Sequence, residues 1–117
     1  MGEVFQDHLR DLFEPMGGVS LRKMFGGLGI FRDGVMFGLV ADDELYLKVD
    51  ETNEAAFEAE GCGPFVYAAR GREMEMSYRR LPERLYDEPD EFRDWALKAF
   101  AVADRTRKPK KAPRKRK

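Results

Sequence analysis

The sequence predicts an α+β fold, in which an N-terminal, a short central and a C-terminal helix pack with an antiparallel β meander and a β hairpin. Apolar residues recur at the helical period near both ends of the chain, and two hairpin patterns lie between them. This order of elements lacks the strand–helix alternation of a doubly wound fold. The chain has 117 residues, 43% of them hydrophobic, which suffices for one domain with a real core.

The first helix is predicted from an apolar stripe that stops at two glycines. The stripe residues follow the helical spacing: Phe5, His8, Leu9, Leu12, Phe13 and Met16. Gly17 and Gly18 end the helix, because glycine readily adopts the left-handed conformation found at helix ends. His8 is the only histidine, and its place in the stripe predicts that it packs at the edge of the core.

A β meander of three strands follows, with residues 19–24 as a candidate fourth strand before them. Residues 28–32 and 35–41 flank Asp33-Gly34, and this dipeptide between two apolar runs predicts a hairpin with a type I′ turn. In residues 44–49, apolar residues alternate with polar ones, so one face of that strand is apolar.

A short helix and a second hairpin are predicted next. Thr52 is the expected N-cap of a helix at residues 53–60, which the Gly61–Pro64 segment then breaks. The hairpin joins residues 65–69 to residues 73–79 through a turn around Arg70-Gly71-Arg72. In its second strand, Met74, Met76 and Tyr78 face one way, and Glu73, Glu75 and Ser77 face the other.

The C-terminal helix is predicted to start near residues 87–91, where acidic residues suit the positive end of the helix dipole. Its inner stripe consists of aromatic residues and alanines: Phe92, Trp95, Ala96, Ala99, Phe100 and Ala103. We expect the helix to fray where Pro109 and the basic run begin.

Charge divides the chain into an acidic domain, residues 1–104, and a basic tail, residues 105–117. Nine of the 21 basic residues lie in the tail, which has no acidic residue. The domain therefore has 12 basic and 22 acidic residues, a net charge of −10. A segment this charged, with two prolines and no aromatic residue, cannot form a core, so the tail is predicted to be disordered.

The basic tail is the candidate nucleic-acid contact. Its cationic residues are Arg105, Arg107, Lys108, Lys110, Lys111, Arg114, Lys115, Arg116 and Lys117. If all nine neutralised DNA phosphates, the slope of log K against log salt would be roughly −8. Such binding is expected to be nonspecific, because the tail has no aromatic side chain for stacking on bases. The alternatives are a tail that only solubilises the chain or one that folds back on the acidic domain.

Nothing in the sequence marks an enzyme. His8 and the single cysteine, Cys62, lack the spacing of metal ligands, and no third member of a nucleophilic triad is indicated. Cys62 follows a helix end and is interpreted as a small residue in a tight turn. The carboxylates are scattered and show no calcium-loop pattern. We therefore expect no catalytic residue, no metal and no cofactor.

Residues 24–29 form a glycine-rich stretch that admits two interpretations. The favoured one is a bulge or bend at which another backbone approaches closely. The alternative is a small anion- or ligand-binding site, in which backbone N–H groups act with Arg22 and Lys23. The stretch lacks the Gly-Lys-Ser/Thr ending of a P-loop, and a strand rather than a helix is predicted after it.

The same region carries a family resemblance. Residues 19–31, followed by Asp33-Gly34, resemble the opening of the TfoX N-terminal domain of the TfoX/Sxy family. The signature positions matched are Arg22, Met24, Phe25, Gly26, Gly27 and Gly29. Further blocks at residues 45–50, 63–67, 76–78, 81–83 and 91–96 extend the resemblance over nearly all of residues 5–104.

The resemblance implies an α+β regulatory domain without known catalysis. TfoX and Sxy regulate competence genes by assisting a cyclic-AMP receptor protein at certain promoters, and they carry a second, C-terminal domain. The basic tail stands in that place here, so a stand-alone N-terminal domain is expected. The implied partner is a protein of the transcription machinery.

Location and assembly are also expectations. A start without the basic and apolar regions of a signal peptide, one cysteine and no long apolar run together predict a cytoplasmic protein that makes no membrane contact. We expect a monomer or a weak dimer, and an exposed sheet edge is one route to a dimer.

Overall fold

The computed structural model describes residues 3–24, 27–69 and 71–107, and it confirms the α+β fold class. Its elements are α1 (Glu3–Phe13), the 3₁₀ helix η1 (Glu14–Met16), β1 (Val19–Met24), β2 (Gly27–Arg32), β3 (Val35–Ala41), β4 (Glu44–Lys48), α2 (Glu54–Ala59), β5 (Pro64–Ala69), β6 (Arg72–Arg80), the 3₁₀ helix η2 (Glu83–Asp87) and α3 (Pro89–Arg107). The candidate fourth strand of the meander, residues 19–24, is therefore real.

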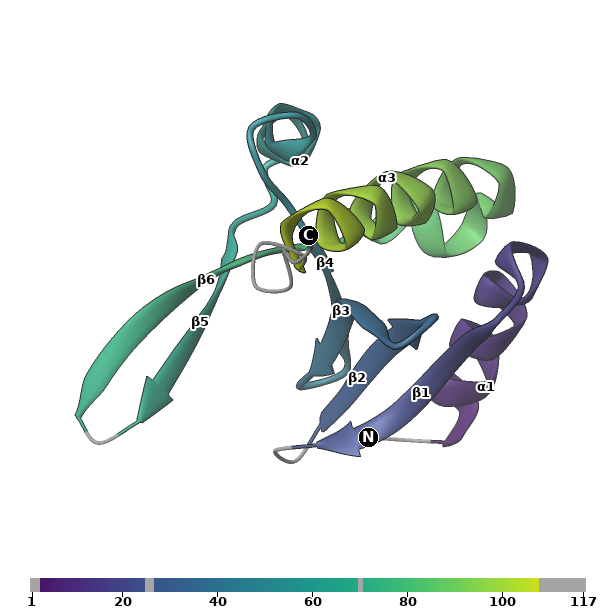
Figure 1. Cartoon of the computed structure of the whole chain (residues 1–117), viewed down its shortest axis with the longest axis horizontal. Coiled ribbons are helices and arrows are strands. Elements are labelled where there is room, and N and C mark those ends of the chain that lie inside the picture. The colour runs from purple at the N-terminus through teal and green to yellow at the C-terminus, as the bar shows by residue number, and fades with distance from the viewer. Residues whose placement is uncertain (1–2, 25–26, 70, 108–117) are drawn as a thin grey trace, which may run out of the picture.

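One antiparallel sheet contains all six strands, in the order β1-β2-β3-β4-β6-β5. The first four strands follow chain order, as a meander does. Strand β6 then inserts beside β4, so β1 and β5 form the two edges of the sheet. Helices α1 and α3 cover one side of the meander, and β5 with β6 extends away from it (Figure 1).

The hairpin between β2 and β3 turns as the Asp-Gly signal predicts. Asp33 and Gly34 both have positive φ, at 54° and 79°, as a type I′ turn requires. Asp42 and Asp43, between β3 and β4, have φ values of 52° and 60° and form a second turn of this kind. Both tight turns place neighbouring strands side by side with short connections.

A β-bulge in β3 turns an extra side chain toward the helices. Ile30 pairs with Gly38 and Phe31 pairs with Met36, which leaves Phe37 without a partner on β2. Phe37 is fully buried, with its ring 5.8 Å from Phe13 of α1 and 5.7 Å from Phe100 of α3. The bulge therefore lets the sheet meet both long helices through one aromatic side chain.

The core lies between the meander and the two long helices. Its fully buried members include residues from α1, the sheet, α2, η2 and α3: Leu9, Phe13, Ile30, Phe37, Leu45, Leu47, Phe57, Leu85, Phe92 and Ala96. The predicted inner stripe of the last helix is confirmed, with Trp95 and Phe100 packed against the core from partly buried positions. Trp95 meets Phe57 at 4.7 Å between ring centroids, which docks α2 on α3.

Two local predictions were wrong. Thr52 does not cap α2, which begins after Asn53; its hydroxyl donates instead to the Asp50 carboxylate at 2.6 Å. His8 does not pack at the edge of the core. Its side chain is exposed, and its Nε2 lies 2.9 Å from the carbonyl oxygen of Tyr86, so it links α1 to η2. In both cases, a nearby polar group satisfies the side chain in a way that helical periodicity does not reveal.

Most of the second hairpin lies beyond the sheet body. Strand β6 pairs with β4 through residues 78–80, and the Ser77 carbonyl oxygen accepts a hydrogen bond from Val49 just after β4, whereas residues 72–75 pair with β5. We call the part of the hairpin at residues 65–69 and 72–77 the arm (Figure 1). Tyr78, at its base, is 7% exposed, but Met74 and Met76 on the same face are 54% and 38% exposed.

Candidate functional site

The glycine-rich stretch lies at the turn of the β1–β2 hairpin. Arg22 and Met24 belong to β1, and Gly27 and Gly29 belong to β2, where Met24 pairs with Gly27 and Arg22 with Gly29. The other two signature residues, Phe25 and Gly26, lie outside the described residues. The stretch thus joins two antiparallel strands, unlike phosphate-binding loops that open a helix.

Close packing accounts for the glycines at two of these positions. A Cβ atom on Gly27 would collide with the backbone carbonyl oxygen of Val40 in β3. A Cβ atom on Gly29 would lie 2.8 Å from the Phe31 ring and would also press on the sulfur of Met24. The close approach of another backbone that the sequence predicts for residues 24–29 is thus confirmed at Gly27, whereas Gly29 is crowded by side chains.

The two cations beside this stretch do not converge on one point. The Arg22 guanidinium lies 4.9 Å from the centroid of the Phe31 ring. Lys23 is the next residue in the strand, so its side chain leaves on the opposite face. An anion held by backbone N–H groups could not meet both charges, and nothing in this geometry favours the anion-binding interpretation.

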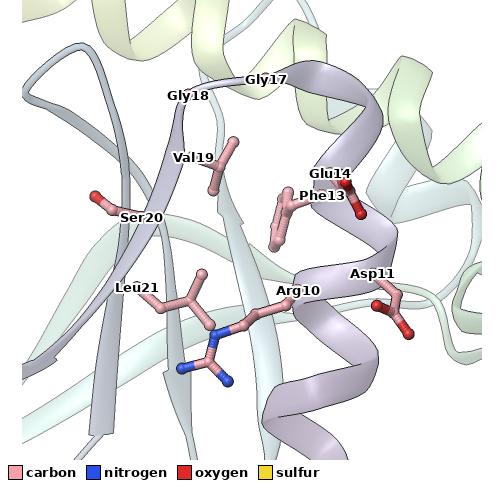
Figure 2. Close-up of a pocket in the computed structure, with 9 residues that line it drawn as sticks. All are labelled: Arg10, Asp11, Phe13, Glu14, Gly17, Gly18, Val19, Ser20 and Leu21. Atoms are coloured by element: carbon pink, nitrogen blue, oxygen red, sulfur yellow. The ribbon is translucent and has the colours of Figure 1, made fainter.

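A groove runs between α1 and the edge strand β1 (Figure 2). Its volume is about 550 Å³, and its lining residues are Arg10, Asp11, Phe13, Glu14, Gly17, Gly18, Val19, Ser20 and Leu21. Phe13, Val19 and Leu21 provide an apolar wall, and the Arg10 side chain extends from α1 toward Leu21 (Figure 2). Because β1 is an edge, every second residue of it turns an unpaired peptide group away from β2.

Asp50 joins the β4–α2 loop to the end of α3. Its carboxylate accepts hydrogen bonds from the backbone N–H and the hydroxyl of Thr52, at 2.8 and 2.6 Å, and from Arg105 at 2.7 Å. The hydrogen bonds from Thr52, together with the Arg105 ion pair, lower the pKa of Asp50 to about 2. Sequence reasoning missed this cluster, although an Asp two residues before a Thr is a recognisable Asx-turn pattern.

The basic tail is therefore divided by the structure. Arg105, one of its nine predicted nucleic-acid contacts, belongs to α3 and is paired with Asp50. Arg107 is the last residue of α3. The other seven lie outside the described residues: Lys108, Lys110, Lys111, Arg114, Lys115, Arg116 and Lys117.

Arginines of β6 and η2 fasten α2 to the rest of the domain. Arg79 donates to Glu54 at 3.0 Å, to Glu58 at 3.2 Å and to the Cys62 carbonyl oxygen at 2.8 Å. Arg84 bridges Glu60 and Glu91, at 2.6 and 2.8 Å, and its hydrogen bonds, together with its charge, lower the pKa of both carboxyls. All these charges pair with one another, so they act as structural ties.

The cysteine and the metal-ligand candidates show no activated group. Cys62 is 2% exposed, and burial raises the pKa of its thiol, which keeps it protonated and unreactive. Among the described residues, no three His, Cys, Asp or Glu side chains are grouped to hold a metal ion. No helix in that part of the chain is long and apolar enough to cross a membrane.

The arm collects exposed apolar side chains. In the part of the chain that the structure describes, six large apolar side chains are exposed, and four of them lie on the arm: Val66, Tyr67, Met74 and Met76. Their exposed fractions run from 38% to 54%. Tyr67, Met74 and Met76 share one face of the arm, and Val66 lies on the other. Exposed apolar side chains gathered on one element make it a candidate interaction surface.

These features define a small α+β domain with two open sheet edges, one beside a groove of mixed polar and apolar lining and the other on an arm with exposed apolar side chains. The sequence of residues 11–103 matches the TfoX N-terminal domain family. The match covers most of the chain and includes every element from η1 to η2. The chain therefore belongs to this family.

The chain is also similar to DNA transformation protein TfoX1 of Aliivibrio fischeri. The two sequences are 31% identical over 91 residues, which is 74% of this chain and 44% of the relative. The chain thus spans less than half the length of that relative. The similarity concerns the domain described above.

Proposed function

We propose that this chain is a non-enzymatic regulatory protein connected with competence, whose folded domain contacts a protein partner. The observation that carries the proposal is membership of the TfoX N-terminal domain family, together with a relative named for DNA transformation. Within the described residues, the fold accounts for the buried thiol of Cys62 and for the ion pairs of Arg79 and Arg84, which we interpret as structural.

A direct test measures transformation. Deleting the gene in its native host should lower the frequency of transformation by added DNA, and a plasmid copy should restore it. A plasmid copy carrying Gly27→Ala, which perturbs the close-packed family signature, serves as a matched fold-disrupted control. Unchanged transformation in the deletion strain under competence conditions would exclude the proposed role.

We further propose that the basic tail gives this module nonspecific affinity for nucleic acid. Of the nine cations, Arg105 is already paired with Asp50 and Arg107 ends α3, so the seven cations of residues 108–117 are the ones we assign to phosphate contact. Neutralising seven phosphates on duplex DNA predicts a slope of log K against log salt of about −6.

The tail can be tested with fluorescent duplex DNA titrated at several salt concentrations. The full chain should bind two unrelated sequences equally, with the steep salt dependence given above. A chain ending at Arg107 should lose this binding, whereas Arg22→Gln with Lys23→Gln, which removes two domain cations, should keep it. Absence of binding by the full chain at low salt would refute the nucleic-acid contact and leave the protein-contact proposal standing.

A further inference from the structure

The arm ends in an edge strand that carries no charge. Strand β5 has the sequence Pro-Phe-Val-Tyr-Ala-Ala and pairs only with β6. Natural proteins usually protect such edges with charged residues, prolines within the strand or a covering element. Here the only proline, Pro64, starts the strand, and Val66 and Tyr67 are 46% and 43% exposed. An uncharged, exposed edge of this kind is suited to pairing with another strand.

We propose that β5 pairs antiparallel with β5 of a second copy of this chain, about a two-fold axis at Tyr67. An isologous two-fold axis perpendicular to a sheet keeps each side chain on its own face, so residues of like parity must face each other. The register with Tyr67 opposite its counterpart is the one that pairs all five residues from Phe65 to Ala69. It leaves Pro64, which has no N–H to donate, outside the new ladder.

The side chains of this register are compatible with self-pairing. Within each arm, Tyr67 lies opposite Met74, so one face of the joined arms carries a continuous row of two methionines and two tyrosines. On the other face, Val66 meets Ala68 of the second copy. Aromatic and apolar cross-strand pairs of this kind stabilise sheets.

Charge does not oppose the pairing. The arm carboxylates, Glu73 and Glu75, lie on β6 opposite Ala68 and Val66. In the joined arms, a β6 carboxylate and the nearest one of the second copy are separated by three strand spacings, about 14 Å. That exceeds the screening length of about 8 Å at physiological salt, so like charges barely repel across the pair. A second copy therefore meets this edge without any charged group facing another.

The size of the contact predicts a weak dimer. Five paired residues give a ladder about 17 Å long, which with its side chains buries roughly 800 Å² in total, less than the about 1,200–2,000 Å² of stable complexes. We therefore expect a dissociation constant on the order of 100 µM. The full chain should then sediment at 13.5 kDa when dilute and approach twice that mass when concentrated.

Two matched pairs of variants test the proposal on the full chain. Tyr67→Lys should keep the mass at 13.5 kDa at every concentration, whereas Leu97→Lys, on an exposed position of α3, should associate like the unchanged chain. Under mild oxidation, Tyr67→Cys should form a disulfide-linked dimer, because directly opposed Cα atoms lie about 4.5–5.5 Å apart. Met74→Cys, at 54% exposure even more open than Tyr67 but about 14 Å from its counterpart, should not.

The native Cys62 adds little background, since it is buried. A concentration-independent monomer mass up to about ten times the expected dissociation constant would overturn the proposal. So would equal cross-linking at positions 67 and 74, since collisions link both positions alike. Preferential cross-linking at position 67, with association lost in Tyr67→Lys, supports it.

Discussion

At the residue scale, Asp50 makes stability depend on acid. Its pKa in the folded protein is about 2, because Thr52 and Arg105 stabilise the carboxylate, whereas an unfolded chain has an Asp pKa near 3.9. A lowered pKa stabilises the fold above about pH 4, and this contribution is lost as pH falls toward 2. We expect the unfolding free energy of the unchanged chain to drop by about 1 kcal/mol more than that of Asp50→Asn between pH 5 and pH 2.5, after allowing for solvent screening. Urea unfolding at the two pH values measures this difference.

Arg105→Gln separates the two causes. This variant removes the ion pair but keeps both hydrogen bonds from Thr52, which make the largest contribution to the shift. It should therefore retain most of the extra pH dependence. If Arg105→Gln lost as much of the pH dependence as Asp50→Asn does, then the positive charge of Arg105, and not the turn at Thr52, would set the pKa of Asp50.

Gly27 tests whether the family signature is a packing feature. The atom that a new Cβ would strike is a backbone oxygen of β3, which cannot move without disturbing the ladder. Gly27→Ala should cost at least about 2 kcal/mol of unfolding free energy. Gly63→Ala is the matched control, because no atom lies within 4 Å of its new Cβ, and it should change stability by less than about 0.5 kcal/mol. If Gly27→Ala left the unfolding free energy unchanged, the hairpin would be able to shift and accommodate the new Cβ, and the packing explanation would be wrong.

At the element scale, local sequence signals predicted the strands and turns but not their surroundings. The Asp-Gly turn and the helical stripes depend only on near neighbours, and they were right. The bulge at Phe37 depends on pairing with another strand, which an alternating pattern does not encode. The groove beside β1 likewise needs α1 placed in three dimensions.

The same limit explains the arm. Alternation in β6 identifies two faces, but it does not say whether anything covers either face. Tyr78 is buried where β6 pairs with β4, with the Lys48 ammonium 5.1 Å from its ring centroid, and Met74 is exposed because β6 has left the sheet body by then. The alternation of methionines and glutamates is the same whether the apolar face of the strand is covered or exposed, so the sequence does not distinguish the two cases.

The arm is held mainly by the pairing of β5 with β6, and this predicts that it is locally unstable. Two-stranded ribbons are marginally stable in water, and amides open locally where few apolar contacts hold them. In dilute protein, amides of residues 65–69 and 72–77 should exchange with solvent much faster than those of β2 and β3. Hydrogen exchange resolved by residue measures this, and equal protection in the two regions would contradict it. At high protein concentration, pairing of β5 with a second copy should slow exchange in the arm selectively.

At the scale of the whole molecule, one core connects every helix to the sheet, while charge is distributed unevenly along the chain. Residues 1–107 have 14 basic and 22 acidic residues, a net charge of −8, and residues 108–117 add +7. A body of one sign is destabilised by its own repulsion, and a tethered segment of the other sign offsets this in a salt-dependent way. The single tryptophan, Trp95, packs between α3 and α2 and reports unfolding of this body.

We therefore expect removal of residues 108–117 to lower the melting temperature at low ionic strength and not at high ionic strength. In about 10 mM salt, where the screening length is about 30 Å, the shortened chain should melt a few degrees below the full chain. In about 1 M salt, with screening within about 3 Å, the two should melt together. Trp95 fluorescence during heating gives both values. A full-length control with the seven tail cations changed to glutamine should follow the shortened chain, because only the charges matter in this account. A difference that persists in high salt would show that residues 108–117 act by packing against the domain, and it would also remove them from the pool of cations free to meet DNA.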